Sequence, residues 1–313
     1  MKEFDLLANV YHANDMLPAS VTIPPGDDMG AIAAHAGDTL VTVDQIADGV
    51  HFELGKVSLA RIARKAITRN LSDVAAMGAI PTGAVVAACL PRDFGQDQAT
   101  QLFNHMRQTA SDYGCPLFGG DISMWDGKLL MSVTVLARMQ AGVLPILRQG
   151  ARPGDILCVT GKLGGSLQEV SGYIHHLDFS PRLEVGQMLA SSLAIRPNSM
   201  LDLSDGLSRD VGHLLTDGLG AEIDLHHLPV SDGAIAASQT DGRPAWQHAL
   251  ADGEDYELCF TISPDKLATL GHELAGVKVT AVGRITDKPG VVSCDANGTI
   301  RPIEAWGWEH QGT

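Results

Sequence analysis

The sequence predicts an α+β protein with two domains. Its 313 residues are enough for two cores of ordinary size. Strand-like and helix-like segments are mixed without strict alternation, which favours α+β domains over a doubly wound parallel sheet. A Pro- and Gly-rich passage over residues 149–155 interrupts the pattern near the middle of the chain. We therefore expect one domain over residues 1–147 and a second over residues 148–313.

Period-two and helical spacings follow one another in the first half. A β-rich apolar run ends at Asp44, and apolar residues then recur every three or four positions through Met77. A later apolar run is stopped by Pro91. In order, we expect a strand over residues 39–43, a helix over 58–77, a strand over 83–90, a helix over 98–113 and a strand over 129–137.

In the second half, a predicted strand over residues 156–160 runs into the glycine-rich segment 161–166. Backbone N–H groups of such a segment can hold a phosphate, and a flexible turn leading to a helix is the ordinary alternative. The sequence contains neither a P-loop motif nor a Rossmann glycine fingerprint. The pairs His175-His176 and His226-His227 lack partners at ligand spacing, so we expect surface or turn positions for them. A last strand is expected over residues 258–262.

Composition excludes several classes of protein. With 45% hydrophobic and 19% charged residues, the chain is typical of a soluble globular protein. The formal net charge of −15, without a dense run of Lys or Arg, argues against nucleic-acid binding. No apolar run reaches membrane-spanning length and the N-terminus lacks a signal-peptide core, which predicts no membrane association and a cytoplasmic location. Five cysteines without a CxxC pair argue against a zinc site or a disulfide framework.

Several aspartates stand on elements that otherwise read as apolar. Alternation along the first strand puts Thr42 and Asp44 on one face. On the helix over 58–77, Asp73 lies on a stripe that should be buried. Asp202 and Ser204 share a face near the end of another apolar run.

Carboxylates in such places, with few Lys or Arg nearby, call for a hard cation. Mg²⁺ prefers oxygen ligands and commonly completes its octahedron with water or phosphate, which points towards nucleotide chemistry. The ordinary alternative is that each Asp forms a turn or caps a helix, and this alternative is strong for Asp27 and Asp205.

Seven motifs occur in an order and spacing that resemble the thiamine-monophosphate kinase family. This family shares a superfamily with aminoimidazole ribonucleotide synthetase and selenophosphate synthetase, and the resemblance runs from about residue 3 to residue 310. The motifs are Gly26-Asp27-Asp28, Thr42-Val43-Asp44 with Gly49-Val50-His51-Phe52, the run from Asn70 to Gly78, Gly119-Gly120-Asp121, Arg148 with the run from Gly150 to Asp155, the run from Leu203 to Leu207, and the run from Gly253 to Leu258.

The resemblance implies a reaction: ATP and thiamine monophosphate give ADP and thiamine diphosphate by direct transfer, without a phosphoenzyme. It also implies a homodimer formed through a mixed sheet in the N-terminal half. Mg²⁺ ions around the ATP phosphates would be held by Asp28, Thr42, Asp44, Asp73, Asp121, Asp202 and Asp205. ATP itself would be contacted by Gly120, Asp121, Arg148 and Ser204, and thiamine monophosphate by His51, Glu254 and Trp308.

These implied roles agree with the chemistry of phosphoryl transfer. Such a reaction needs aligned, neutralised phosphate oxygens and no protein nucleophile. Metal ions fixed by carboxylates from separate segments supply that neutralisation, and an Arg adds a rigid fork of donors.

Three positions depart from the family pattern. Val43 stands where a threonine is common, Gly165 stands where Gly-Asp-Ser is usual, and Ile122-Ser123 follow Gly120-Asp121 in place of two threonines. They leave open an ATP-dependent enzyme of the superfamily with another acceptor, and a non-catalytic nucleotide-binding paralogue. A metal-dependent phosphohydrolase would also use clustered aspartates, but it would hydrolyse ATP without an acceptor.

Overall fold

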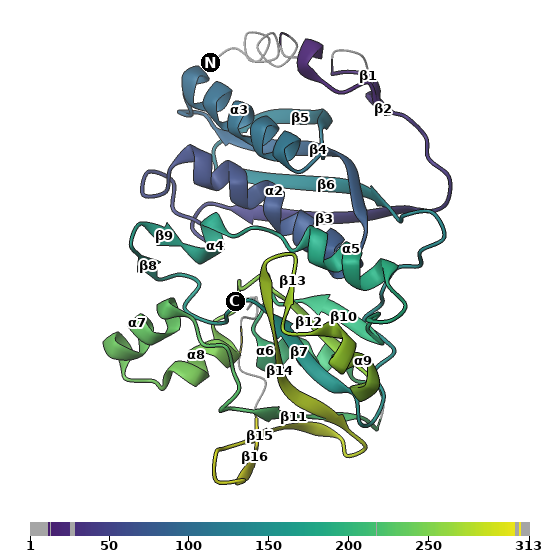
Figure 1. The fold of residues 1–313 in the computed structure, drawn as a ribbon. Coiled ribbons are helices and arrows are strands. Elements are labelled where there is room, and N and C mark those ends of the chain that lie inside the picture. Colours follow the sequence, from purple (N-terminus) through teal and green to yellow (C-terminus); the bar gives the residue numbers. More distant parts are fainter. Residues whose placement is uncertain (1–11, 13, 26–28, 217, 304–306, 308–313) are drawn as a thin grey trace. The chain divides into compact units, whose positions relative to one another are not determined.

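The computed structural model describes residue 12, residues 14–25, 29–216 and 218–303, and residue 307 (Figure 1). The predicted site residues Asp28 and Trp308 lie outside the described residues. The chain forms two compact units, one of residues 1–74 with 80–141 and one of residues 75–79 with 142–313.

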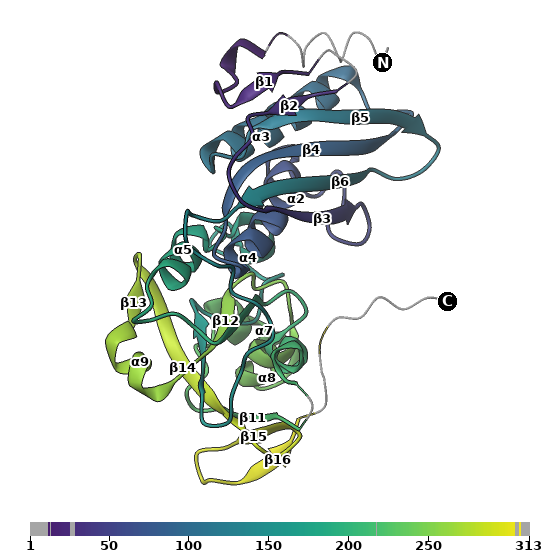
Figure 2. The ribbon, with the colours of Figure 1, turned by 90° about the vertical axis from the view of Figure 1, so that its right-hand side faces the viewer.

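The first unit contains a four-stranded mixed sheet in the order β3-β6-β4-β5. Its β4 and β5 are parallel, and the other two pairs are antiparallel. Helices α2 and α3 lie on one face of this sheet (Figure 2). A short 3-10 helix η1 and a two-stranded sheet precede these elements. The bounds are η1 Asn14–Met16, β1 Val21–Ile23, β2 Ala31–Ile32, β3 Thr39–Ala47, α2 Leu59–Ala76, β4 Ile80–Pro91, α3 Gln96–Asp112, β5 Leu117–Trp125 and β6 Leu130–Arg138.

Alternation of side chains explains how the first sheet uses its two faces. Along β6, Met131, Val133 and Val135 are buried, and the residues between them are half-buried. Along β3, Val41 and Val43 are 63% and 59% exposed. The residues between them, which include Thr42 and Asp44, point to the other face. This confirms the predicted pairing of Thr42 with Asp44 on one face of the strand.

The second unit is built on a larger sheet in the order β10-β12-β7-β14-β11-β15-β16, with β13 paired to β14. This sheet is also mixed, because β11 and β15 run parallel. A separate pair, β8 and β9, forms a small hairpin. The strands are β7 Ile156–Thr160, β8 Glu169–Val170, β9 Tyr173–Ile174, β10 Ser199–Asp202, β11 Gly220–Asp224, β12 Leu258–Ile262, β13 Glu273–Leu274, β14 Val277–Thr286, β15 Gly290–Cys294 and β16 Ile300–Pro302. The helices are α4 His175–Asp178, α5 Leu183–Ser191, α6 Leu207–Asp210, η2 Val211–Leu214, α7 Asp232–Asp241, α8 Ala245–Ala251 and α9 Pro264–Leu270.

One face of this sheet forms a core of aliphatic side chains. Leu157 and Val159 of β7 contribute to it, and so do Ala221 and Ile223 of β11. Residues of α6, η2 and α8 pack into the same cluster, which includes Leu207. Glu222 lies between Ala221 and Ile223 and therefore points to the opposite face.

The α+β class is confirmed, and several predicted elements agree closely with the observed ones. β7 and β12 have the predicted bounds, and α2 lies within the predicted 58–77 helix. β3 continues four residues beyond the predicted end at Val43, because its antiparallel pairing with β6 extends to Ala47. Within the part of the chain that the structure describes, no helix combines the length and the apolar character needed to cross a membrane. All five cysteines are free, and Cys115, Cys158 and Cys259 are buried.

Candidate functional site

In the first unit, β3 and α2 bring Thr42 and Asp73 into direct contact. The Thr42 hydroxyl donates a hydrogen bond of 2.5 Å to Oδ2 of Asp73. Asp44 follows two residues later on the same face of β3. The helix continues past Asp73 to Ala76 and ends where Gly78 adopts a left-handed φ of +68°. The predicted neighbours Thr42, Asp44 and Asp73 therefore form one oxygen-rich group.

A positively charged side chain, that of Arg69, lies beside this group. Arg69, one turn before Asp73 on α2, places its NH2 nitrogen 3.6 Å from Oδ1 of Asp44 and donates a 3.0 Å hydrogen bond to the carbonyl of Gln45. The expectation of few Lys or Arg nearby was therefore wrong for Asp44. The Asp44 side chain nevertheless stays 31% exposed, so solvent or a ligand can reach it.

A buried amide lies one turn before Asp73. Asn70 is fully buried, and its amide nitrogen donates to the carbonyl of Ala66 at 3.2 Å. Its Oδ1 has no hydrogen-bond partner among the described residues. A buried acceptor without a donor is energetically costly.

His51 lies in the turn that follows β3. Its Nδ1 accepts a 3.1 Å hydrogen bond from the backbone N–H of Ala47. A neutral imidazole with an accepting Nδ1 carries its proton on Nε2. The backbone carbonyl of His51 accepts from Nζ of the buried Lys65 at 3.1 Å. The turn is thus fixed from both sides.

Gly120 and Asp121 lie at the other edge of the sheet from Asp44. Across the strands, Asp44 is opposite Val133, Val133 is opposite Val86, and Val86 is opposite Gly120. Three strand spacings amount to about 14 Å, too far for Asp44 and Asp121 to share one ion within this sheet. A Cβ on Gly120 would stand 2.2 Å from the carbonyl oxygen of Val86, so only glycine fits. The structure does not bring Asp121 to the group formed by Thr42, Asp44 and Asp73.

Among the residues with described positions, no cluster of three or more His, Cys, Asp or Glu has the geometry of a complete metal site. Two carboxylates and a hydroxyl fit Mg²⁺, which usually binds one or two carboxylates and takes its other ligands from water and phosphate. The donor set around Asp73 is therefore compatible with Mg²⁺ only if further oxygens come from a ligand.

In the second unit, Ser204 and Asp205 lie in a turn between β10 and α6. Their backbone N–H groups donate to Oδ2 of Asp210 at 3.0 and 2.9 Å. Burial raises the pKa of the Asp210 carboxyl to about 6. Asp202, at the end of β10, is 7% exposed. Asp210 was not among the predicted site residues, because nothing in the four-residue segment Leu-Ser-Arg-Asp of α6 distinguishes it from an ordinary surface acid.

The segment after Gly253 runs alongside this turn. The N–H of Glu254 donates to the carbonyl of Ser204 at 2.7 Å, and the N–H of Tyr256 donates to that of Leu203 at 2.8 Å. Glu254 and Tyr256 have φ angles of +53° and +50°. Left-handed backbone is unfavourable for such residues and is held only where the surroundings enforce it, often at functional sites. The two predicted segments thus form one structure.

The histidine pair 175–176 was predicted wrongly as surface or turn. His176 is 8% exposed, and its Nδ1 lies 3.0 Å from Oε2 of Glu254. Nε2 of His175 lies 2.6 Å from the carbonyl oxygen of Asp255. Both contacts span about 80 residues of sequence, so no local pattern reports them. His226 and His227 are exposed in the turn after β11, as predicted.

A buried ion pair supports the same segment from behind. Arg182 donates two hydrogen bonds to the carboxylate of Glu257, one of them at 2.7 Å from Nε to Oε2. The hydroxyl of Thr160 donates to the same Oε2 at 2.6 Å. The Glu257 side chain is only 2% exposed. These donors balance the buried charge and fix the position of Glu254 three residues earlier.

The glycine-rich segment 161–166 is neither a phosphate cradle nor a flexible turn into a helix. The N–H of Gly164 donates to Asp255 at 2.7 Å, and the N–H of Gly165 donates to Asp252 at 2.8 Å. The backbone donors needed for a phosphate are therefore used inside the protein. A Cβ on Gly165 would lie 2.0 Å from the backbone carbon of Gly233. This close packing explains why a glycine stands at 165, and the chain continues into β8.

Arg148 is exposed in the segment that approaches β10. The carbonyl of the preceding Leu147 accepts a 3.0 Å hydrogen bond from the N–H of Met200. Gly150, with φ of +138°, comes so close to Asn198 that a Cβ would lie 2.2 Å from its carbonyl oxygen. The Arg148 side chain has no ion pair or hydrogen bond to any described residue. Its guanidinium is available to a ligand at the start of β10.

Val43 points away from the oxygen-rich group. It lies between Thr42 and Asp44 in β3 and is exposed on the opposite face. Its side chain therefore does not stand beside Asp44, and the loss of a hydroxyl at this position leaves Thr42, Asp44 and Asp73 in place.

Comparison with known proteins agrees with this arrangement. Residues 26–139 match the family model described as AIR synthase related protein, N-terminal domain. A thiamine-monophosphate kinase of Rhodopirellula baltica is 37% identical over 271 residues, covering 86% of this chain and 83% of the relative. A crystal structure of thiamine-monophosphate kinase from Stenotrophomonas maltophilia is 30% identical, with a TM-score of 0.80 over 94% of this chain and 96% of the other. A solved structure of AaThiL complexed with AMPPCP and TMP is 27% identical, with a TM-score of 0.74 over 99% and 97% of the two chains. Sequence and fold together place this chain in the thiamine-monophosphate kinase family.

Proposed function

We propose that this protein transfers the terminal phosphoryl group of ATP to thiamine monophosphate and so forms thiamine diphosphate. The observation that carries the proposal is the contact between Thr42 and Asp73, with Asp44 on the same strand face, in a chain of the thiamine-monophosphate kinase family. Further support comes from a relative of the same fold that was solved with AMPPCP, an ATP analogue, and TMP.

We assign Mg²⁺ to the oxygen-rich group of the first unit. Bound there, the metal would neutralise charge on the phosphate oxygens during the transfer. Asp44 and Asp73 would supply carboxylate ligands and Thr42 a hydroxyl ligand. The Thr42 hydroxyl, which donates to Asp73, would also orient that carboxylate. Asp28, Asp121, Asp202 and Asp205 are proposed as ligands of other Mg²⁺ ions around the ATP phosphates, and Asp28 lies outside the described residues.

The remaining site residues bind and orient the two substrates. Arg148, whose guanidinium lacks a described partner, would hold ATP phosphate oxygens through its fork of donors. Gly120 would contact the nucleotide through its backbone, and Ser204 through its backbone or its hydroxyl. On the acceptor side, His51 would bind thiamine monophosphate. Glu254 is fixed near His176 by its 3.0 Å contact and would bind the same substrate. Trp308, also assigned to this substrate, lies outside the described residues.

We also propose that the protein is a cytoplasmic homodimer, with domains over residues 1–147 and 148–313. The sheet face opposite α2 and α3 exposes Val41 and Val43 on β3 and Trp125 on β5. Large apolar side chains gathered on one sheet face favour a partner. Val43→Glu should therefore convert a dimer into a monomer in light scattering, whereas Ile300→Glu, at an exposed position in the other unit, should not. A wild-type monomer, or a Val43→Glu variant that stays dimeric, contradicts this part.

The test of the activity is a stoichiometric assay. The purified protein is incubated with Mg-ATP and thiamine monophosphate, and ADP and thiamine diphosphate are separated by chromatography. The proposal predicts one thiamine diphosphate for each ADP and little ADP when the acceptor is left out. ADP formed equally without acceptor would indicate a phosphohydrolase. The absence of both products at high enzyme concentration would indicate a non-catalytic paralogue.

A further inference from the structure

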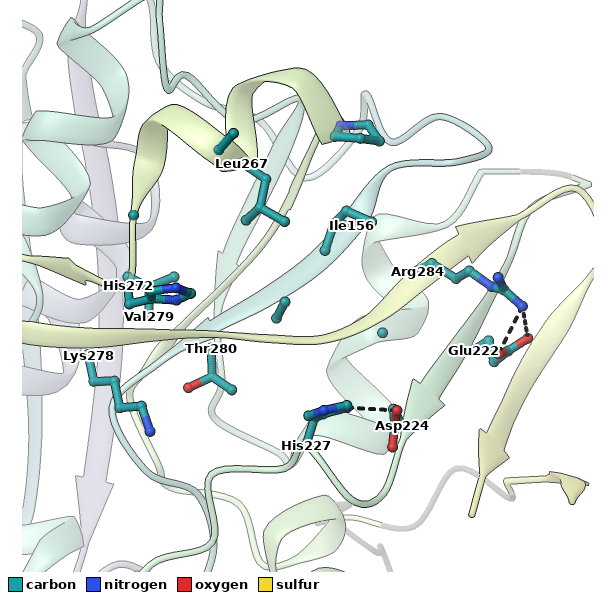
Figure 3. A pocket seen from close by; sticks show the side chains of 15 residues that line it. Ile156, Glu222, Asp224, His227, Leu267, His272, Lys278, Val279, Thr280 and Arg284 are labelled. Carbon is teal, nitrogen blue, oxygen red and sulfur yellow. Dashed lines mark hydrogen bonds and ion pairs between the residues drawn. The ribbon is translucent and has the colours of Figure 1, made fainter. Parts of the chain in front are cut away.

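A pocket of about 810 Å³ lies in the second unit, between α9, β14 and the end of β11 (Figure 3). Its volume is within the range of ordinary small-molecule sites. None of the residues that line it belongs to the site described above. The proposed kinase reaction therefore gives this pocket no role.

The pocket lies beside a stretch of β14 that has no paired strand on one of its edges among the described residues. The carbonyl of Lys278 accepts from Gly161 on the β7 side, and the N–H of Val279 donates to His272, next to β13, at 2.8 Å. Successive residues of a strand direct their backbone groups to opposite edges, so β13 lies on the edge away from β7. β11 also pairs with β14, and along β14 this pairing begins only at Gly283. The residues between these two pairings, 280–282, have no strand partner on this edge in the described chain.

The residues that line the pocket come from both sides of β14 next to this gap. Lys278 and Thr280 lie on one side of β14, and Leu267 and Ile156 lie on the other (Figure 3). By the same alternation, the backbone N–H of Ala281 points into the gap. A register shift between Ala281 and Gly283 marks a bulge here, and bulges re-aim side chains at functional places.

Three polar side chains of the wall are without partners. Oγ1 of Thr280 is buried and makes no hydrogen bond to any described group. The side chains of Lys278 and His272 form no ion pair or hydrogen bond with the residues that have described positions. All three can donate hydrogen bonds, and Lys278 carries a positive charge.

Both acidic side chains of the wall already have side-chain partners. Glu222 accepts two 3.0 Å hydrogen bonds from Arg284, and Asp224 lies 2.7 Å from Nδ1 of His227. Lys278 is the lysine of this described wall, and its ammonium group has no ion pair with a described residue, in a protein whose formal net charge is −15. The rest of the lining is largely apolar and includes Ile156, Leu267 and Val279.

We propose that this pocket binds a small organic anion with an apolar body. Its carboxylate or phosphate meets Lys278, Thr280 and the N–H of Ala281, and its apolar part lies against Leu267 and Ile156 on the far side of the strand edge. The buried hydroxyl without a partner and the unpaired lysine would bind the charged group of such a molecule, and the apolar wall would bind its body.

The test uses the fluorescence of 8-anilinonaphthalene-1-sulfonate, an aromatic anion, titrated into the native full-length protein. Lys278→Glu removes the cation, and Ala268→Trp fills the pocket from α9 without changing its charge. Lys288→Glu is the matched control, because Lys288 is an exposed lysine of the same unit outside the pocket. Unchanged thermal unfolding midpoints confirm that each variant is folded, and two independent variants keep the test valid if one of them misfolds.

We expect a saturable site in the wild type and dissociation constants at least tenfold higher in Lys278→Glu and Ala268→Trp. Lys288→Glu should stay within twofold of the wild type. Thr280→Val should weaken binding about threefold to tenfold, the range expected for one hydrogen bond. Displacement of the probe by benzoate, or by phenyl phosphate, tells which oxyanion the site prefers. A wild type without saturable binding, or folded pocket variants that bind like the wild type, would overturn the proposal.

Discussion

Asp44 of the first unit and Glu257 of the second are carboxylates with different surroundings. Asp44 is 31% exposed and has one cation at 3.6 Å. Glu257, in contrast, is 2% exposed and is held by Arg182 and Thr160. A buried carboxylate surrounded by protein donors has no capacity left for a ligand, whereas a half-open one can accept a cation from solvent. This difference assigns metal binding to Asp44 and support of the fold to Glu257.

The largest expected effect is that of Asp73→Asn on turnover. The variant keeps the shape of the side chain but loses a carboxylate ligand, which should lower the rate of thiamine diphosphate formation about 10³-fold, or about 4 kcal/mol. Product chromatography under initial-rate conditions measures it. Asp126→Asn is the control, because Asp126 is an exposed acid of the same unit paired with Arg92 at 2.5 Å. Near-normal turnover in Asp73→Asn would show that Asp73 is not a metal ligand.

Glu257→Gln should act on stability instead. The substitution leaves the Arg182 guanidinium without its counter-charge in a buried place, so the free energy of unfolding should fall by about 3 kcal/mol. Denaturant titration followed by circular dichroism gives the value. Glu222→Gln is matched to it, since Glu222 also binds an Arg with two hydrogen bonds but the Arg284 side chain is 60% exposed. The control should lose less than about 1 kcal/mol, and equal losses would show that burial does not distinguish the pairs.

The raised pKa of Asp210 predicts how the free energy of unfolding depends on pH. Burial raises its pKa to about 6 in the folded protein, so the folded state keeps a proton that the unfolded chain releases near pH 4. This contribution is complete below about pH 4 and is lost as the pH rises through 6, and it amounts to about 3 kcal/mol at most. Relative to Asp210→Asn, the wild type should therefore lose unfolding free energy between pH 4 and pH 7. Denaturant titrations at four pH values measure it, and a constant difference would mean that the carboxyl is ionised throughout.

A comparison of Gly165→Ala with Gly242→Ala distinguishes the cost of a steric clash from the cost of left-handed backbone. Gly165 has φ of +65° and no room for a Cβ next to Gly233, so alanine should cost about 2 kcal/mol. Gly242→Ala has a similar φ of +77° but meets nothing within 4 Å, and it should cost about 1 kcal/mol. Thermal unfolding compares the two variants. Equal losses would mean that the clash at Gly165 is relieved by a small shift of the chain.

Local patterns were sufficient for the regular elements and for one half of the site. Helical spacing predicted α2, continuous apolar runs predicted β7 and β12, and alternation placed Thr42 with Asp44. What sequence spacing could not supply was the pairing of distant segments. The segment 161–166 has the composition of a phosphate loop, yet two of its N–H groups bind Asp255 and Asp252, which lie 91 and 87 residues later. His176 was missed for the same reason, because its partner is Glu254.

The central claim is that metal binding belongs to the open carboxylates around Asp73 and not to the enclosed ones around Glu257. Electron paramagnetic resonance of Mn²⁺, which takes the same oxygen ligands as Mg²⁺, measures it directly in the presence of AMPPCP. We expect Asp73→Asn to raise the Mn²⁺ dissociation constant at least tenfold, and Glu257→Gln, assayed well below its unfolding midpoint, to leave it within twofold. Wild-type Mn²⁺ affinity in Asp73→Asn would contradict the account.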